Sequence, residues 1–139
     1  MISYEHQAQY YETDQMGIIH HSNYIRWMES ARIWWMTQLG VDYGNMEKEG
    51  IVSPVLEVFC QYKSMVRFGD TVLITPRIEK YNGIKLELSY KITDKVSGEV
   101  KTIGMSKHCF LDRNGKPVSL KKAYPVYDEA FKKGMETVE

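Results

Sequence analysis

The sequence lacks an excess of charge of either sign. Its 139 residues contain 18 Lys and Arg against 18 Asp and Glu, so the formal net charge is zero. Binding to a nucleic-acid backbone depends on many Lys and Arg side chains, and the longest basic runs here are the pairs Lys121-Lys122 and Lys132-Lys133. The composition therefore disfavours a DNA- or RNA-binding protein.

Long apolar runs are missing as well. A membrane-spanning helix needs roughly 20 consecutive apolar residues, and no stretch of this chain approaches that length. The amino terminus reads MISYEHQ, which has neither the basic start nor the apolar run of a secretory signal. We therefore expect a cytoplasmic protein without a membrane span.

Cysteine is scarce, with two residues in the chain. Cys60 and Cys109 both lie in apolar, strand-like surroundings, and they lack the close spacing of metal sites or redox pairs. We expect both to be reduced residues of the core. Asp14, His20 and His21 also have no recognised metal-ligand spacing, so neither a metal ion nor another cofactor is expected.

The chain does contain enough apolar material for one hydrophobic core. Apolar residues make up 43% of the sequence and aromatic residues 12%, whereas disordered chains are poor in both. The sequence contains no repeat, low-complexity tract or Pro/Ser-rich linker. We therefore expect residues 1–139 to form a single domain.

The second half of the chain predicts an antiparallel sheet. Apolar and polar residues alternate over residues 84–93, a period of two that is typical of a strand with one wet face. Asn82-Gly83 and Ser97-Gly98 flank this segment and suit tight hairpins. Pro76 indicates that part of its strand lies at an edge or a bulge. The expected strands are 3–10, 55–62, 71–81, 84–94 and 99–112.

Apolar residues at spacings of three and four predict a long helix over residues 23–39. The apolar surface exceeds one stripe, so we expect this helix to be surrounded by other elements. Ser22 or Asn23 can cap its start, and Gly40 can end it. A shorter helix is expected at 125–133. One buried helix and a set of antiparallel strands predict an α+β fold, with the sheet curled around the helix.

The segment from Tyr10 to Tyr24 gathers residues that suit acyl chemistry. Backbone N–H groups at a helix start can hold an oxyanion, and a carboxylate such as Asp14 can act as a nucleophile or a base. Ordinary structural roles also fit: Asp14 as a turn residue, His20 and His21 as solvated or packed imidazoles, and Tyr10 as a core residue. The residues by themselves leave both interpretations open.

A longer pattern includes this segment. It reads Thr-Asp-x-x-Gly-Ile-Ile-His-His-x-x-Tyr-x-x-x-x-Glu over residues 13–29 and is followed by Ala31-Arg32. It resembles the signature of the 4-hydroxybenzoyl-CoA thioesterase family, and within it the YbgC-like acyl-CoA thioesterases. The later segment Val66–Asp70, with a Gly-Asp pair before a strand, resembles a second landmark of that family. The order of elements and the chain length match too.

The resemblance implies a hotdog fold, in which an antiparallel sheet of about five strands wraps around a long central helix. It also implies a homodimer or homotetramer with sites at the subunit interface. The implied activity is hydrolysis of an acyl-CoA, or of an acyl carrier protein thioester, to a free acid and a thiol. The family's catalytic residues fall on Asp14, His21 and Tyr10. We expect substrate contacts from Gly17, Ile19, His20 and Arg67.

Several alternatives remain open at this level. Asp14 can attack the thioester carbonyl or activate a water molecule. Glu29 is a second candidate acid, because another hotdog branch places its catalytic acid on the central helix; Arg26 and Arg32, three residues away on either side, favour ion pairing or an interface contact instead. A non-catalytic acyl-ligand binder or assembly module could retain the same fold. The candidate cations for CoA are Arg67, Lys107, His108 and Arg113.

Overall fold

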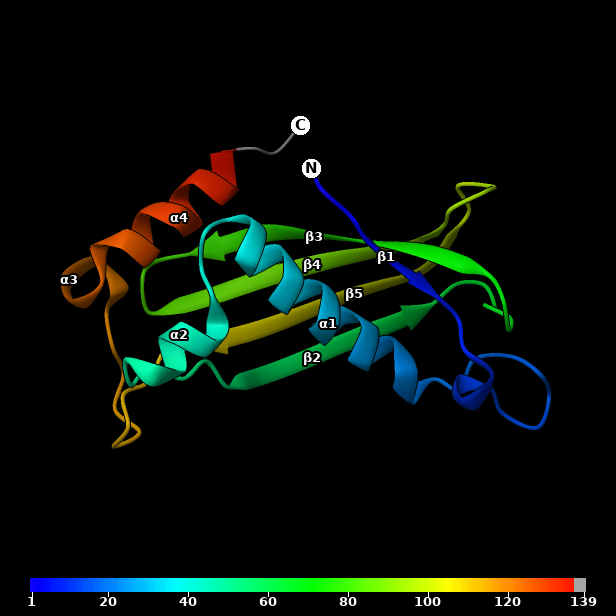
Figure 1. The fold of residues 1–139 in the computed structure, drawn as a ribbon, viewed down its shortest axis with the longest axis horizontal. Coiled ribbons are helices and arrows are strands. Elements are labelled where there is room, and N and C mark those ends of the chain that lie inside the picture. Colours follow the sequence, from blue (N-terminus) through cyan, green and yellow to red (C-terminus); the bar gives the residue numbers. More distant parts are fainter. Residues whose placement is uncertain (137–139) are drawn as a thin grey trace.

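A computed structural model describes residues 1–136 and contains one five-stranded antiparallel sheet. Its spatial order is β1-β3-β4-β5-β2. The long helix α1 (Ser22–Gln38) lies across one face of this sheet (Figure 1). This arrangement confirms the expected α+β class and the hotdog fold. The strands are β1 (Tyr4–Gln7), β2 (Val55–Tyr62), β3 (Thr71–Tyr81), β4 (Lys85–Asp94) and β5 (Val100–Cys109).

The remaining helices cluster at one end of the molecule (Figure 1). They are α2 (Tyr43–Lys48), α3 (Leu120–Ala123) and α4 (Pro125–Glu136), and a 3₁₀ turn, η1, covers Tyr10–Glu12. The sequence pattern predicted α4, although three residues too short, but it did not predict α2, α3 or η1. The hydroxyl of Tyr81 on β3 donates a hydrogen bond of 2.6 Å to Asp128, which joins α4 to the sheet.

The core lies between α1 and the sheet. Trp27, Met28 and Ala31 of α1 are buried against sheet residues such as Ile74 and Leu88. The opposite side of α1 is exposed, and even Ile25 is 42% accessible. The expectation that this helix is surrounded is therefore wrong for the single chain, because one sheet covers only one side of a helix. Gly40 follows the helix with a φ of 92°, as expected for a helix end.

β2 forms an apolar edge of the sheet. Its only strand partner within residues 1–136 is β5, so its outer edge is unpaired. Cys60 of β2 is half-buried against Met28, with the sulfur atoms 3.8 Å apart, and both cysteines are free thiols. An exposed apolar edge favours pairing with another strand. The exposed apolar residues of β2 are Val55, Leu56, Val58, Phe59 and Tyr62.

Two expected strands are shorter than predicted by more than one residue. The strand expected at 3–10 ends at Gln7, because the chain turns into η1, where the Glu12 side chain accepts the N–H of Gln9. The strand expected at 99–112 spans only Val100–Cys109, because Leu111 instead forms isolated bridges to Val52 and Pro117. Pro76 of β3 pairs with Tyr90 of β4 but lies beyond the outermost β1–β3 pair, Tyr4 with Ile74. Its strand is therefore at an edge there, as expected.

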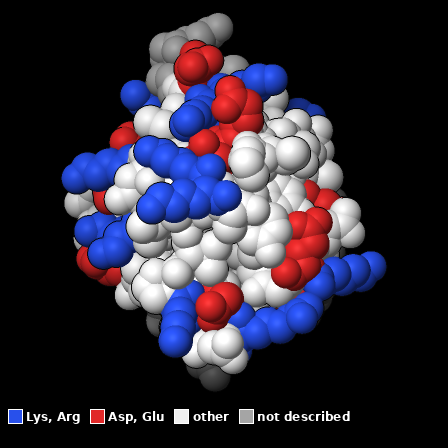
Figure 2. All heavy atoms as spheres, turned by 90° about the vertical axis from the view of Figure 1, so that its left-hand side faces the viewer, with Lys and Arg blue, Asp and Glu red and all other residues white. Residues whose placement is uncertain are grey.

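Charges of both signs are interspersed on the end of the molecule that carries α2 and α3 (Figure 2). No single-sign patch dominates this face, in keeping with the balanced composition. Among the helices of residues 1–136, none is both long and apolar enough to cross a membrane.

Candidate active site

The loop between η1 and α1 holds Asp14 in a tight turn. The N–H of Gly17 donates to the Asp14 carbonyl at 3.2 Å, and the N–H of Asp14 donates to the Ile18 carbonyl at 2.8 Å. Gly17 has a φ of 77°, which a residue with a Cβ rarely adopts. The Asp14 side chain is oriented too, because its Oδ1 accepts the N–H of Met16 at 2.7 Å. The turn therefore fixes both the backbone and the carboxylate of Asp14.

Glu12 anchors this loop from inside the protein. Its carboxylate is buried and accepts three hydrogen bonds: from the Trp27 indole at 2.7 Å, from the Gln9 N–H at 2.8 Å and from His6 at 3.0 Å. Burial by itself would raise the pKa of Glu12, but the hydrogen bonds from Trp27, Gln9 and His6 lower it below its ordinary value. The sequence pattern did not single out Glu12, although a glutamate three residues after Gln9 has the spacing of a capping box.

The two histidines have different surroundings. Nδ1 of His20 accepts the N–H of Ser22 at 3.2 Å, so His20 caps the start of α1. The His21 ring stacks against His20, with the ring centres 4.2 Å apart, and lines the cavity described below. Asn23 is buried and donates to the carbonyls of Glu12 and His20, which ties the helix start to the loop.

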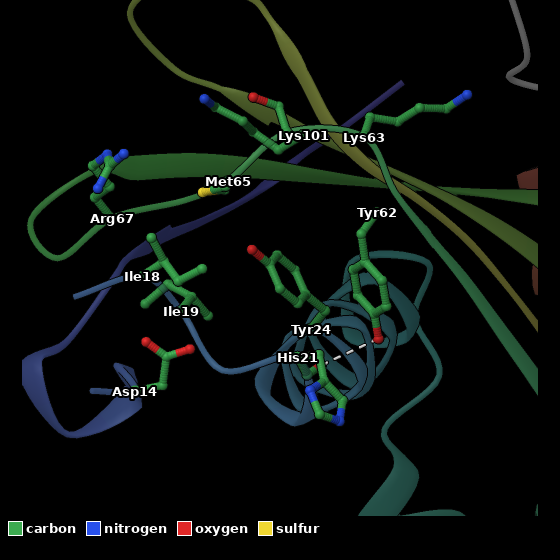
Figure 3. Close-up of a pocket in the computed structure, with 11 residues that line it drawn as sticks. Asp14, Ile18, Ile19, His21, Tyr24, Tyr62, Lys63, Met65, Arg67 and Lys101 are labelled. Atoms are coloured by element: carbon green, nitrogen blue, oxygen red, sulfur yellow. Dashed lines mark hydrogen bonds between the residues drawn. The ribbon is translucent and has the colours of Figure 1, made fainter. Parts of the chain in front are cut away.

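A cavity of about 720 Å³ lies between this loop, the start of α1 and the end of β2. Figure 3 shows Asp14 and His21 on one side of it, with Lys63 and Lys101 on the opposite side and Arg67 beyond Ile18. Burial raises the pKa of Tyr24 and of Tyr62, so both phenols stay neutral at pH 7. The lining residues are Asp14, Ile18, Ile19, His21, Tyr24, Tyr62, Lys63, Ser64, Met65, Arg67 and Lys101.

Two backbone N–H groups beside the cavity are unoccupied. Between residues 17 and 24, the N–H groups of Ile18 and His21 are the ones that donate to no other described group. Those of Ser22, Asn23 and Tyr24 already bond His20 or His21. The sequence favoured N–H groups near residues 17–21 and at the start of α1 as donors, and the two free groups fall within residues 17–21 rather than in the first turn of α1. The free donors lie just before it, in two residues that line the cavity.

The cavity includes four of the residues expected from the sequence: Asp14, Ile19, His21 and Arg67. Gly17 shapes the turn and His20 caps the helix, and neither lines the cavity. Tyr10 is 76% exposed and packs edge-on against Phe68 rather than lining the cavity.

The cations of the cavity only partly match the expected ones. Lys63 and Lys101 line it beside Arg67, and Lys101 pairs with Glu99 at 2.7 Å. The other expected cations lie elsewhere: Lys107 pairs with Glu57, His108 is buried in the core, and Arg113 bonds the Lys48 carbonyl. Lys63 and Lys101 belong to segments far apart in the sequence, so only the fold reveals that they share a cavity with Asp14.

Glu29, the alternative acid, does not line the cavity and is exposed on α1. Within residues 1–136 it forms no ion pair with Arg26 or Arg32. In the same part of the chain, no three His, Cys, Asp or Glu side chains converge into a metal-binding group.

Comparisons with known proteins define the family. The family model described as the thioesterase-like superfamily matches residues 9–131, and the chain belongs to this superfamily. Its relatives include YneP of Bacillus subtilis (strain 168), whose name assigns it provisionally to the acyl-CoA thioesterases. YneP is 38% identical over 130 residues, which cover 93% of this chain and 94% of YneP.

Solved structures agree with this assignment. A DHNA-CoA thioesterase from Staphylococcus aureus is 34% identical, with a TM-score of 0.90, and the match covers 95% of this chain and 89% of that one. A second S. aureus protein, solved in complex with CoA, also has a TM-score of 0.90, and the match covers 100% of this chain and 89% of that one. At 14% identity, this second likeness shows the fold alone.

Proposed function

We propose that the protein is an acyl-CoA thioesterase that hydrolyses a thioester to a free acid and CoA in the cavity around Asp14. The observation that carries this proposal is the composition of the cavity, which is lined by an oriented carboxylate, an imidazole, three cations and the two residues whose backbone N–H groups are free. The names of the two relatives that are at least 34% identical give independent support.

The proposed chemistry begins at the thioester carbonyl. Asp14 either attacks this carbon and displaces the CoA thiolate, giving a mixed anhydride that water then hydrolyses, or removes a proton from a water molecule that attacks directly, after which the C–S bond breaks and the CoA thiolate leaves with that proton. Both routes place negative charge on the carbonyl oxygen, and the N–H groups of Ile18 and His21 stabilise it. His21 orients the water. No metal ion or redox cofactor takes part in either route.

The proposed substrate lies across the cavity. Arg67, Lys63 and Lys101 bind the phosphates of CoA, and the acyl group packs against Tyr24, Tyr62 and the two isoleucines. The zero net charge of the chain provides no general attraction for an anionic coenzyme. Its phosphates must therefore be bound by a few local cations. An acyl carrier protein, which carries the same thioester, is the alternative substrate.

The acyl group is proposed to be a hydroxylated aromatic ring. The motif over residues 13–29 supports the 4-hydroxybenzoyl-CoA and YbgC-like branch, whereas the S. aureus relative is named for DHNA-CoA. A dihydroxynaphthoyl and a hydroxybenzoyl group share a hydroxylated ring, which suits a cavity lined by two neutral tyrosines. A panel of 4-hydroxybenzoyl-, DHNA- and straight-chain acyl-CoAs, followed by thiol release, separates these possibilities.

We also propose that the protein assembles as a homodimer or homotetramer. Support comes from the apolar, unpaired edge of β2, which a second copy can cover by strand pairing. The end of β2 reaches the cavity at Tyr62, so such a dimer places the second copy beside the site.

The test of the proposed chemistry is Asp14→Asn. We expect kcat/KM on the best substrate of the panel to fall about 100-fold or more, because the amide is neither a nucleophile nor a base. Asp112→Asn is the matched control: Asp112 also accepts the N–H two residues later, at 2.8 Å, but lies outside the cavity. Equal activity of the Asp14 variant and the unmutated protein would refute the mechanism.

Inactivity on every thioester would refute the enzymatic proposal as a whole. Calorimetric binding of acyl-CoA without turnover would then favour the second candidate function, a non-catalytic acyl-ligand binder. The absence of both binding and turnover would favour an assembly role.

A further inference from the structure

Arg32 is a buried cation without a carboxylate. It lies midway along α1 and is 8% exposed. Its Nη1 is 3.4 Å from Nε2 of His108, which also lies 2.6 Å from the Ser106 hydroxyl. Within residues 1–136, no Asp or Glu oxygen lies within 4 Å of the guanidinium. A buried charge is costly unless an opposite charge accompanies it.

His108 does not supply that opposite charge. Burial and the adjacent Arg32 guanidinium lower the pKa of His108 to about 3, so the imidazole is neutral at pH 7. Because Arg32 can only donate, Nε2 of His108 accepts and its proton lies on Nδ1. Ser106 and Tyr90 continue the same chain of neutral hydrogen bonds. The cluster orients Arg32 without neutralising it.

An unpaired acid lies one helical turn away. Glu29 is exposed on α1, three residues before Arg32, and has no ion-pair partner in the described chain. It is close enough to the cluster to contribute to the raised pKa of Tyr90, for which burial is the main cause. One chain therefore presents an unsatisfied cation and an unsatisfied anion side by side.

The same part of α1 lies beside the open edge of the sheet. The Tyr24 and Tyr62 rings are 5.2 Å apart, Met28 contacts Cys60, and Arg32 bonds His108, which is paired with Val55 of β2. Residues later in α1 therefore lie beside residues earlier in β2. The middle of β2, at Val58 and Phe59, is level with α1 between Met28 and Arg32.

Symmetry then brings the two charges together. If β2 pairs antiparallel with β2 of a second copy about its middle, directly opposed residues share one face of the sheet, so the two-fold axis passes through a residue that opposes its own copy, Val58 or Phe59. The two α1 helices then run antiparallel on the same side of the joined sheet. The two helices pass each other near residue 30 of each copy, so position 29 of one copy lies near position 32 of the other.

We propose that the Glu29 carboxylate of a second copy binds the Arg32 guanidinium, and reciprocally, as two symmetric ion pairs across a β2-to-β2 dimer. The pairs neutralise both buried cations, and the apolar residues of β2 are covered in the same step. The inference rests on the dimer of the proposed function but not on its thioesterase chemistry.

The first test measures the dimer dissociation constant by analytical ultracentrifugation of the full-length chain. Glu29→Gln should weaken the dimer about 30-fold or more, because removing one member of a buried charge pair leaves the other unpaired. Glu47→Gln, which changes an exposed acid on α2, should leave the dissociation constant unchanged. An unchanged dimer in Glu29→Gln would overturn the proposal, and a ligand carboxylate would become the favoured partner of Arg32.

The second test exchanges the charges. Glu29→Arg and Arg32→Glu should each be monomeric alone, and an equimolar mixture should form heterodimers, because both cross-pairs are then opposite in sign. If Arg32→Glu does not fold, the Glu29→Arg variant mixed with unmutated chain still decides: its heterodimer should be weaker than the unmutated dimer. Equal strength would overturn the proposal. Thiol release is assayed in parallel, so a failed dimer prediction is distinguishable from a failed enzyme prediction.

Discussion

Glu12 and Arg32 are both buried charges on or beside α1, but they differ in their partners. Glu12 has three hydrogen-bond donors within its own chain, whereas the partners of Arg32 among residues 1–136 are neutral. The first charge joins β1, the Asp14 loop and α1 into one unit. The second charge, the Arg32 guanidinium, has no carboxylate partner among residues 1–136. The difference shows that neighbouring elements of one chain can carry a buried charge with full partners in the monomer and a buried charge that, as we propose, a second copy neutralises.

The largest expected effect comes from removing the satisfied charge. Glu12→Leu leaves the Trp27 indole and the Gln9 N–H buried without an acceptor, so we expect the free energy of unfolding to fall by about 3 kcal/mol or more. Urea unfolding measures it. Glu5→Gln, which removes an exposed ion pair with Lys95, should cost less than about 1 kcal/mol. Similar costs for the two variants would contradict the role given to Glu12.

A smaller effect concerns His108 and pH. Its folded pKa, about 3, lies below the ordinary 6.5, so the unfolded chain binds a proton that the folded chain rejects. Stability should therefore decline as the pH falls below 6.5, by about 2 kcal/mol between pH 7 and pH 5 from this residue. His108→Gln should flatten that decline, and His21→Gln, a control at an exposed histidine, should not. Parallel profiles for all three proteins would contradict the assignment.

The smallest expected effect comes from removing the unsatisfied charge. In the Glu29→Arg background, where we expect a monomer, Arg32→Met replaces a buried guanidinium by an apolar chain of similar length. The free energy of unfolding should change by less than about 1 kcal/mol or rise, because replacing a buried charge by an apolar residue is often neutral or favourable. Thermal unfolding measures the change. A loss as large as that of Glu12→Leu would show that Arg32 already has its full partners within one chain.

Much of the fold could be predicted from periodicity. The strands at 55–62 and 71–81 have the expected bounds, and α1 differs by one residue at each end. The short helices α2 and α3 could not be predicted in this way, because four to six residues are too few to show a helical period. The motif resemblance located the Asp14 turn within the chain.

The remainder of the candidate site depends on tertiary contacts. Lys63 and Lys101 reach the cavity only because β2 pairs with β5. The unoccupied N–H groups of Ile18 and His21 follow from which neighbouring donors find acceptors, and a pattern of residue types does not contain that information. For the same reason His20 could not be recognised as a helix cap.

The three hydrogen bonds of Glu12 also affect the order of events in folding. They connect residues 6, 9 and 27, so the loop that carries Asp14 is held in place only once α1 has docked on β1. The loop therefore reaches its final position together with the burial of Trp27. The turn of a refolding chain can orient the Asp14 carboxylate through its own hydrogen bonds, but it is tied to the central helix only when Trp27 reaches Glu12.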